Sequence, residues 1–246
     1  MKVSEALVTR KSVRAFLEQP VTAAQITQIL HFARQSPSGT NTQPWQVAVV
    51  SGAAKRQLDQ RLLSAFEAGR GKELDYNYYP LKLSPEFQRR RVACGMQMYQ
   101  TLGITRQQPE QRLLQWAKNY TAFDAPMVLY FFSDKLIEKG SFIDNGMFIQ
   151  SVMLMAAELG LATCPQAALA EYPALVKEFL GYSNDSILLC GMAIGYEDTT
   201  ALINSYRTPR EEVATFTRFF DQHPARTGSP CRTGSPCRTG SPGEPE

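Results

Sequence analysis

Residues 126–132, "PMVLYFF", form an uninterrupted apolar run after the polar stretch "KNYTAFDA". Successive side chains of a strand point to opposite faces, so an apolar strand without alternation needs cover on both faces of its sheet. Two further short apolar runs, "WQVAVV" (45–50) and "SILLCGMAIGY" (186–196), are also predicted strands. The sequence therefore predicts a central sheet that is covered by helices.

Helical patterns alternate with these strands along the chain. In residues 21–35, Thr22 is a predicted N-cap, and apolar residues follow at the i, i+3, i+4 and i+7 spacing of a helix face. Residues 145–160 are apolar nearly all round, which is typical of a central buried helix. Further helices are predicted at 53–69, 85–103, 109–120 and 172–181, and residues 69–85 are a predicted long loop. This order indicates one α/β-type domain with an extended C-terminal arm from about residue 200.

The last residues differ in composition from the rest of the chain. "RTGSPC" recurs from about residue 225 onward, and Gly, Ser and Pro do not bury enough apolar surface to offset the entropy of ordering. We therefore expect a single domain at residues 1–224 and a low-complexity, disordered tail at residues 225–246.

Composition excludes several classes of protein. The 246 residues are 43% hydrophobic and 20% charged, as in ordinary globular proteins, and the net charge of +3 does not favour nucleic acid or a membrane surface as a partner. No apolar run approaches the roughly 20 residues that span a bilayer. The N-terminus also lacks an apolar signal core. We expect a cytoplasmic protein.

Metal and nucleophile chemistry has little support in the sequence. The chain has five cysteines without a C-x-x-C pair and only two histidines, so Cys94, Cys164 and Cys190 are expected to be buried free thiols and no metal site is expected. Phosphate-loop, dinucleotide-binding and nucleophile-elbow motifs are absent from the sequence. If the protein is an enzyme, its reactive group is expected to come from a cofactor.

Two short basic segments flank the apolar body of the chain. In "RKSVR" (10–14), an extended backbone would place Arg10, Ser12 and Arg14 on one face, where they suit a phosphate or a polyoxygenated ligand. Near residue 208, "YRTPR" holds Arg207 and Arg210 around a proline. Each segment by itself is also compatible with a solvated surface. They would meet only if the chain ends come together or two chains pair.

Two other segments combine small residues with hydrogen-bonding groups. "SPSGTNTQPW" (36–45) places neutral donors and acceptors before a strand, and its glycine allows close backbone approach. In "TCPQAALAEYP" (163–173), small residues leave backbone N–H groups uncovered for a flat ligand. The alternatives are an ordinary turn and an ordinary strand-to-helix loop.

Taken in order, these four segments resemble the FMN-dependent nitroreductase family. The match runs from about residue 5 to 220 and includes "RKSVRAF", "ARQSPSGTNTQPW", "APMVLYFF", "LGLATCPQAAL" and "CGMAIGYED…NSYRTPREE". The resemblance implies an α+β fold, with a mixed, mainly antiparallel sheet flanked by helices. It also implies an intertwined homodimer whose C-terminal arm embraces the partner, with FMN bound at the subunit interface. The insert at 69–85 resembles the longer nitrobenzene and nitrobenzoate reductases.

The resemblance also assigns roles to residues. The cofactor-binding set comprises Arg10, Lys11, Ser12, Arg14, Pro37, Ser38, Gly39, Asn41, Gln43, Asn119, Pro165, Gln166, Ala167, Ala168, Arg207 and Arg210. Lys11 would point away from the FMN if its segment is extended, and Lys118 is an alternative to Asn119. The loop at 37–43 would come from the other subunit. No side chain is assigned as catalytic; Arg14 and the backbone N–H of Ala167 would tune the flavin.

The implied reaction is hydride transfer from NADH or NADPH through flavin N5 to a nitroaromatic compound, which gives nitroso and then hydroxylamine products in a ping-pong sequence. Tyr76, Tyr78, Tyr79 and Phe123 are aromatic candidates for binding a flat substrate, although packing of their loop onto the body is an alternative. Other readings keep the FMN and change the acceptor to quinones, enones or free flavin, or make the protein a non-catalytic flavin binder.

Overall fold

The computed structural model describes residues 1–220, and its contacts divide the chain into two compact units. The first unit is Met1–Thr208, and the second begins at Pro209. Within residues 209–220 the second unit contains one short helix, α8 (Val213–Phe216), in which the Thr215 N–H donates to the Glu212 carbonyl. The predicted single domain at 1–224 and the tail at 225–246 extend into residues outside the described range.

The first unit is built on a four-stranded sheet with the order β1-β2-β4-β3. Its strands are β1 (Gln46–Ser51), β2 (Met127–Asp134), β3 (Ala162–Gln166) and β4 (Ser186–Gly195). Each of the three pairings is antiparallel, and a parallel contact occurs at the isolated bridge between Ser12 and Thr163. The predicted mixed, mainly antiparallel sheet is confirmed in its antiparallel part.

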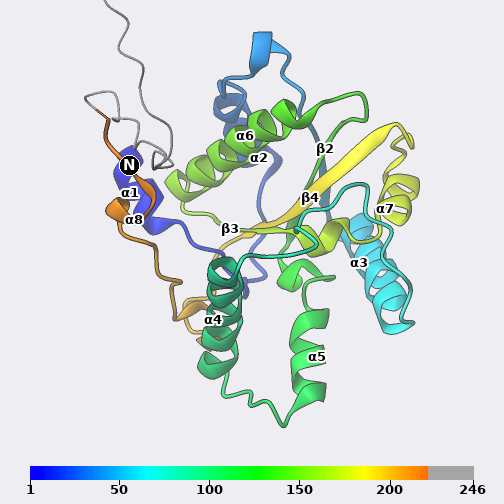
Figure 1. The fold of residues 1–246 in the computed structure, drawn as a ribbon. Coiled ribbons are helices and arrows are strands. Elements are labelled where there is room, and N and C mark those ends of the chain that lie inside the picture. Colours follow the sequence, from blue (N-terminus) through cyan, green and yellow to red (C-terminus); the bar gives the residue numbers. More distant parts are fainter. Residues whose placement is uncertain (221–246) are drawn as a thin grey trace, which may run out of the picture. The chain divides into compact units, whose positions relative to one another are not determined.

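Strand β2 shows why the apolar run at 126–132 needs cover on both faces. Val128 and Tyr130 pack into a buried cluster with residues of α3 (Gly52–Glu67) and α7 (Pro173–Leu180). Leu129 and Phe131 pack into another with residues of α2 (Ala23–Ala33) and α6 (Lys139–Glu158). Helices therefore cover opposite faces of the sheet (Figure 1). The alternation of strand side chains divides one apolar run between two cores.

Most predicted elements are present with shifted ends. The Thr22 hydroxyl caps α2 by accepting from the Gln25 N–H at 3.2 Å, as predicted. The remaining predicted helices are α4 (Pro85–Thr101) and α5 (Pro109–Ala117). The sequence analysis assigned neither the short helix α1 (Val3–Thr9) nor strand β3. Four 3-10 turns complete the first unit: η1 (Gly39–Asn41), η2 (Ala122–Asp124), η3 (Ala167–Ala170) and η4 (Leu202–Asn204).

Helix α6 is central, as predicted from residues 145–160. Phe148, Val152 and Ala156 are buried in the core, and Ile149, Met153 and Met155 are partly buried against it. Ile143, which precedes the predicted stretch, is 68% exposed. The apolar residues that remain half-covered create a surface that favours another protein surface over water.

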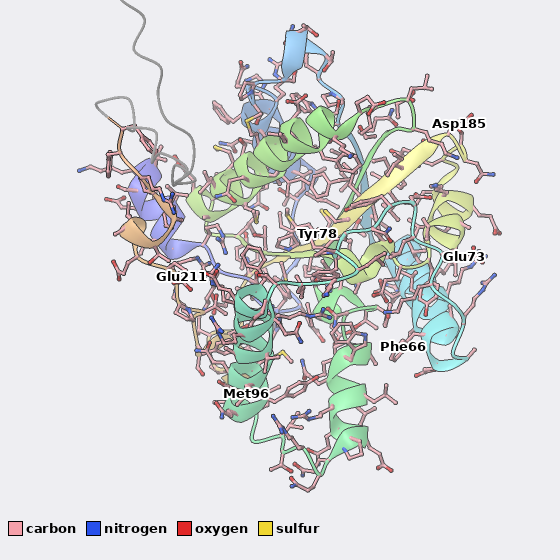
Figure 2. All side chains as sticks on the ribbon, in the orientation of Figure 1. Phe66, Glu73, Tyr78, Met96, Asp185 and Glu211 are labelled. Atoms are coloured by element: carbon pink, nitrogen blue, oxygen red, sulfur yellow. The ribbon has the colours of Figure 1, made fainter. Side chains whose placement is uncertain are left out.

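The segment from residue 77 to residue 118 carries α4 and α5 and projects away from the sheet (Figure 1). Within this described segment, α4 has no buried residue, and Met96 on α4 is 42% exposed (Figure 2). Cys94 on α4 is exposed, contrary to the expectation of a buried thiol, whereas Cys164 and Cys190 are buried as expected. Besides its two ends, the segment is held through α4, where Gln97 Nε2 donates to the Arg207 carbonyl at 3.0 Å.

No helix among the described residues is long and apolar enough to cross a membrane. Within residues 1–220, no group of three or more His, Cys, Asp or Glu side chains is arranged to hold a metal ion.

Candidate functional site

The basic segment at residues 10–14 lies along β3. Ser12 forms a parallel bridge with Thr163, and the Val13 N–H donates to the Thr163 carbonyl at 3.1 Å. Val13 is buried, as the predicted two-residue alternation requires for the face opposite Arg10, Ser12 and Arg14. The extended conformation was the condition for those three side chains to share a face.

Asn204 joins this segment to the end of the first unit. Its Oδ1 accepts from the Arg14 N–H at 2.8 Å, and its Nδ2 donates to the carbonyls of Ala15 and Asp198 at 2.9 and 2.8 Å. Asn204 is only 3% exposed. The sequence analysis quoted this asparagine within "NSYRTPREE" but gave it no role, because a buried hydrogen-bonding knot has no spacing signature.

Arg207 lies beside the N-terminal segment. Its guanidinium donates to the carbonyls of Thr9 and Arg10, and its own carbonyl accepts from Gln97 Nε2 of α4 at 3.0 Å. The structure thus brings the predicted residues Arg10 and Arg207 together from sequence positions almost 200 residues apart. Several positive charges in one region favour an anionic ligand.

Lys11 is engaged differently from these arginines. Its Nζ forms an ion pair with Glu197 at 2.8 Å and donates to the Asn204 carbonyl at 2.5 Å. These contacts tie the N-terminal segment to the end of β4. The segment is extended, which is the conformation in which Lys11 is expected to point away from the cofactor. The cofactor role of Lys11 stays a prediction.

The end of β3 and the turn η3 contain the predicted residues Pro165, Gln166, Ala167 and Ala168. Gln166 Nε2 donates to the Asn119 carbonyl at 3.0 Å and to Asn119 Oδ1 at 3.3 Å. Gln166 Oε1 is buried and has no hydrogen-bond partner within the described chain. Leaving a buried acceptor without a donor costs free energy, so Gln166 Oε1 is suited to accept a hydrogen bond from a bound ligand.

Phe123 lies in a left-handed turn beside this region. Ala122, Phe123 and Asp124 have φ values of 51°, 55° and 58°. This conformation costs about 1–2 kcal/mol for each residue with a Cβ. The Arg14 guanidinium carbon lies 6.0 Å from the centre of the Phe123 ring. The turn therefore connects Asn119 and Phe123 to the same region as Arg14, although Phe123 itself is buried in the single chain.

The predicted loop at 37–43 is held by α6. The Gly39 N–H donates to Asp144 Oδ2 at 3.2 Å, the Ser36 and Ser151 hydroxyls are 2.8 Å apart, and Trp45 stacks on Phe148 with ring centres 4.7 Å apart. Ser38 closes the loop by accepting from the Gln43 N–H at 3.0 Å. Thr40, Asn41 and Gln43 have positive φ values. A strained, well-anchored surface loop is typical of a binding segment.

The side-chain hydrogen bonds of this loop run to Asp144 of α6 and within the loop itself. Asp144 and its neighbours on α6 were not identified from the sequence. The signal for them was their spacing: Asp144, Phe148 and Ser151 lie at i, i+4 and i+7 on one helix face.

The three predicted substrate tyrosines have different surroundings. Tyr76 is anchored: its hydroxyl donates to the Leu189 carbonyl at 2.7 Å, and its ring lies 5.1 Å from Phe142. Tyr78 (Figure 2) and Tyr79 are each 56% exposed. Their rings pack edge to face, and the Arg91 guanidinium lies over the Tyr79 ring. The contacts of Tyr76 fit the alternative in which this loop packs onto the body of the protein. Arg210 lies in the second unit, where its guanidinium donates to the Pro209 carbonyl.

Cys164 of β3 is buried and interacts with Ser12 and Arg14. Burial raises the pKa of its thiol to about 11, although Arg14 and the hydrogen bond from Ser12 act in the opposite direction. The thiol is therefore neutral near pH 7 and is not a nucleophile in the site.

The antiparallel sheet between two helical layers matches the fold of solved FMN-dependent nitroreductases. Residues 7–196 match the model of the Nitroreductase family. The chain belongs to this family.

Relatives with assigned names and solved structures agree with the family. The chain is 35% identical over 213 residues to a 4-nitrobenzoate reductase of Pseudomonas putida, which covers 87% of this chain and 93% of the relative. It is 31% identical over 218 residues to a chloronitrobenzene nitroreductase of Comamonas testosteroni, at 88% and 96% coverage. The crystal structure of the FMN-dependent nitroreductase NfnB from Mycobacterium smegmatis with NADPH aligns with a TM-score of 0.84 and 34% identity, at 88% and 97% coverage.

Proposed function

We propose that this protein is an FMN-dependent NAD(P)H nitroreductase that reduces nitroaromatic compounds. The observation that carries the proposal is the meeting of Arg207 with Arg10 at the segment that also holds Ser12 and Arg14. Relatives named as nitrobenzoate and chloronitrobenzene reductases support the choice of substrate class.

The residues present fit FMN. The guanidinium groups of Arg10, Arg14 and Arg207 and the Ser12 hydroxyl are suitable donors for a phosphate and for carbonyl oxygens. Gln166 Oε1 is a buried acceptor that lacks a donor, which an N–H of a ligand would supply. We propose that these five residues, together with Pro165, Ala167, Ala168 and Asn119, hold the cofactor from one subunit.

When bound, FMN supplies the redox chemistry: it takes hydride from NADH or NADPH and passes it to the nitro group. The protein's own groups position the cofactor and polarise it. Arg14 would stabilise negative charge on the bound flavin, and the Ala167 N–H would offer it a backbone donor at the end of β3. In this proposal water supplies the protons, so that no catalytic histidine is required.

A homodimer would complete the site. The loop at 37–43 is held on α6 by the bond from the Gly39 N–H to Asp144, and α6 keeps apolar residues that are only partly covered. A partner subunit would cover these residues and would bring its own Pro37, Ser38, Gly39, Asn41 and Gln43 to the cofactor. Tyr78, Tyr79 and Phe123 remain proposed substrate contacts, Lys11 and Arg210 remain proposed cofactor contacts, and the cytoplasm is the proposed location.

Rapid mixing of the purified protein tests this function. A yellow protein that bleaches with NADH or NADPH and regains its colour on addition of a nitroaromatic compound is a nitroreductase. Recovery only with quinones, enones or free flavin would select those acceptors instead, and no bleaching would leave a flavin-binding protein without turnover.

A pair of variants tests the proposed cofactor clamp. Arg10→Ala/Arg14→Ala should be folded and colourless, because the FMN phosphate and ring oxygens lose their charged donors. Arg61→Ala is the control: Arg61 is an exposed arginine of α3 whose guanidinium lies over Phe179. FMN occupancy equal to wild type in the double variant would contradict the clamp.

A further inference from the structure

Two buried lysines of the same chemistry fix the two ends of the projecting α4–α5 segment. At its start, Lys177 Nζ lies 2.8 and 2.7 Å from the carboxylate oxygens of Asp75. At its end, Lys55 Nζ contacts Asp59 Oδ2 at 2.5 Å and donates to the Thr121 carbonyl at 3.1 Å. Lys177 and Lys55 are 4% and 7% exposed. A lysine this deeply buried requires compensating partners.

The Thr121 carbonyl accepts two hydrogen bonds at the left-handed turn η2, one from the Lys55 ammonium and one from the Asp124 N–H at 3.0 Å. The three residues that follow Thr121 all have positive φ, and none of them is glycine. Such a turn persists only where its surroundings hold it, and Lys55 is the charged group that does so from α3.

The same turn joins a proposed substrate contact to a proposed cofactor contact. Phe123 lies within it, 6.0 Å from the Arg14 guanidinium carbon. The Asn119 carbonyl accepts the Ala122 N–H at 3.1 Å and also accepts from Gln166 Nε2. A change in the turn therefore moves one neighbour of Arg14 and the partner of Gln166 together.

We propose that Lys55, paired with Asp59, is a positioning residue of the FMN site, which holds the strained turn at Ala122–Asp124 and thereby fixes Phe123 and Asn119 against the cofactor. The proposal rests on the proposed function, because it assumes that FMN binds at Arg10, Arg14 and Gln166. Burial raises the pKa of Asp59, which the Lys55 ammonium opposes.

The Asp75–Lys177 pair provides a matched control within the same chain. It is also buried and also an aspartate–lysine pair, and Asp75 in addition accepts the Leu188 N–H at 2.8 Å. Asp75 is bound by Lys177 of α7 and Leu188 of β4. Lys55 instead binds Asp59 of α3 and the Thr121 carbonyl, next to the turn beside Arg14. Equal chemical changes at the two pairs therefore separate a general loss of stability from an effect on the cofactor.

The experiment compares Lys55→Met/Asp59→Asn with Lys177→Met/Asp75→Asn as holoenzymes. Release of FMN on dilution gives its dissociation constant, thermal unfolding gives stability, and amide hydrogen exchange reports residues 122–125. In the Lys55 variant we expect the FMN dissociation constant to rise about tenfold, which corresponds to about 1.4 kcal/mol, with faster exchange at residues 122–125. In the Lys177 variant we expect a similar loss of stability and an unchanged dissociation constant.

A rescue variant tests the strain itself. Asp124 is exposed, and glycine adopts a positive φ without strain, so Asp124→Gly added to the Lys55 variant should restore tight FMN binding. An unchanged FMN dissociation constant in the Lys55 variant, equal weakening at both pairs, or no restoration by Asp124→Gly would overturn the proposal. A wild-type protein that binds no FMN would instead refute the proposed function.

Discussion

Asp144 of α6 accepts the backbone N–H of Gly39 at 3.2 Å, across 105 residues of sequence. Asp144 is buried, and Gly39 begins the turn that carries Asn41. The carboxylate therefore ties the proposed cross-subunit loop to the helix whose apolar side is only half covered. One helix thus both orients the loop and presents a surface suited to a partner.

Replacing this carboxylate should loosen the loop. Asp144→Ala removes the acceptor of the Gly39 N–H, a charge-assisted bond of about 1.5–3 kcal/mol, and should weaken FMN binding about tenfold or more. Asp144→Asn keeps an oxygen acceptor at the same place and is the control, expected to lie near wild type. FMN titration of the two variants checks this, and equal affinity in both would show that the Gly39 contact has no bearing on the cofactor.

Mixed dimers test whether the loop acts on the partner's site. Asn41→Leu and Arg10→Ala/Arg14→Ala should each lose FMN as homodimers. In a mixed dimer of the two chains, a cross-subunit loop places both defects in one site and leaves the other intact, so half of the sites should retain FMN. If the loop serves its own chain, every site carries a defect and the mixed dimer stays colourless. Flavin absorbance of differentially tagged heterodimers distinguishes the two.

The tyrosines of the 69–85 loop should separate into structural and substrate-contacting residues. Tyr76→Phe loses the bond to the Leu189 carbonyl and should lower stability by about 1 kcal/mol without changing the KM for a nitroaromatic. Tyr78→Ala and Tyr79→Ala remove exposed rings and should raise that KM several-fold at little cost in stability, since an aromatic pair is worth about 0.5–1.5 kcal/mol. A KM change in Tyr76→Phe alone would reverse this assignment.

Gly191 of β4 has no room for a side chain. A Cβ at this position would lie 2.5 Å from Leu169 Cδ1 and 2.7 Å from Leu169 Cβ, and Leu169 belongs to the turn η3 that follows Gln166. Gly191→Ala should cost about 1–3 kcal/mol of unfolding free energy. The turn η3 should shift with it.

Denaturant unfolding checks the magnitude, and Gly140→Ala, at a position where an added Cβ meets nothing within 4 Å, is the control. Because Gly191 and Leu169 share one contact, adding Leu169→Ala to Gly191→Ala should cost less than the sum of the two single changes. Strict additivity would show that the close approach does not govern packing at η3.

The sequence was informative wherever one local pattern decides the structure. The apolar run at β2 predicted cover on both faces, and Thr22 predicted the start of α2; both depend on side chains within one element, and both are confirmed. The two-residue alternation at Arg10–Arg14 likewise placed Val13 in the core. Helix α6 was predicted to be central and buried, and it packs into the core, while several of its apolar residues stay only partly buried in a single chain.

The amino-acid sequence by itself determined strands β1, β2 and β4, the helices that cover them and the basic and small-residue segments of the proposed site, because periodicity and residue type act over a few neighbouring residues. Tertiary structure alone decided that Arg207 meets Arg10, that Asp144 holds Gly39 and that Lys55 holds the Thr121 carbonyl. Each of these contacts joins residues far apart in the chain, and their geometry exists only once the two cores have packed against the sheet.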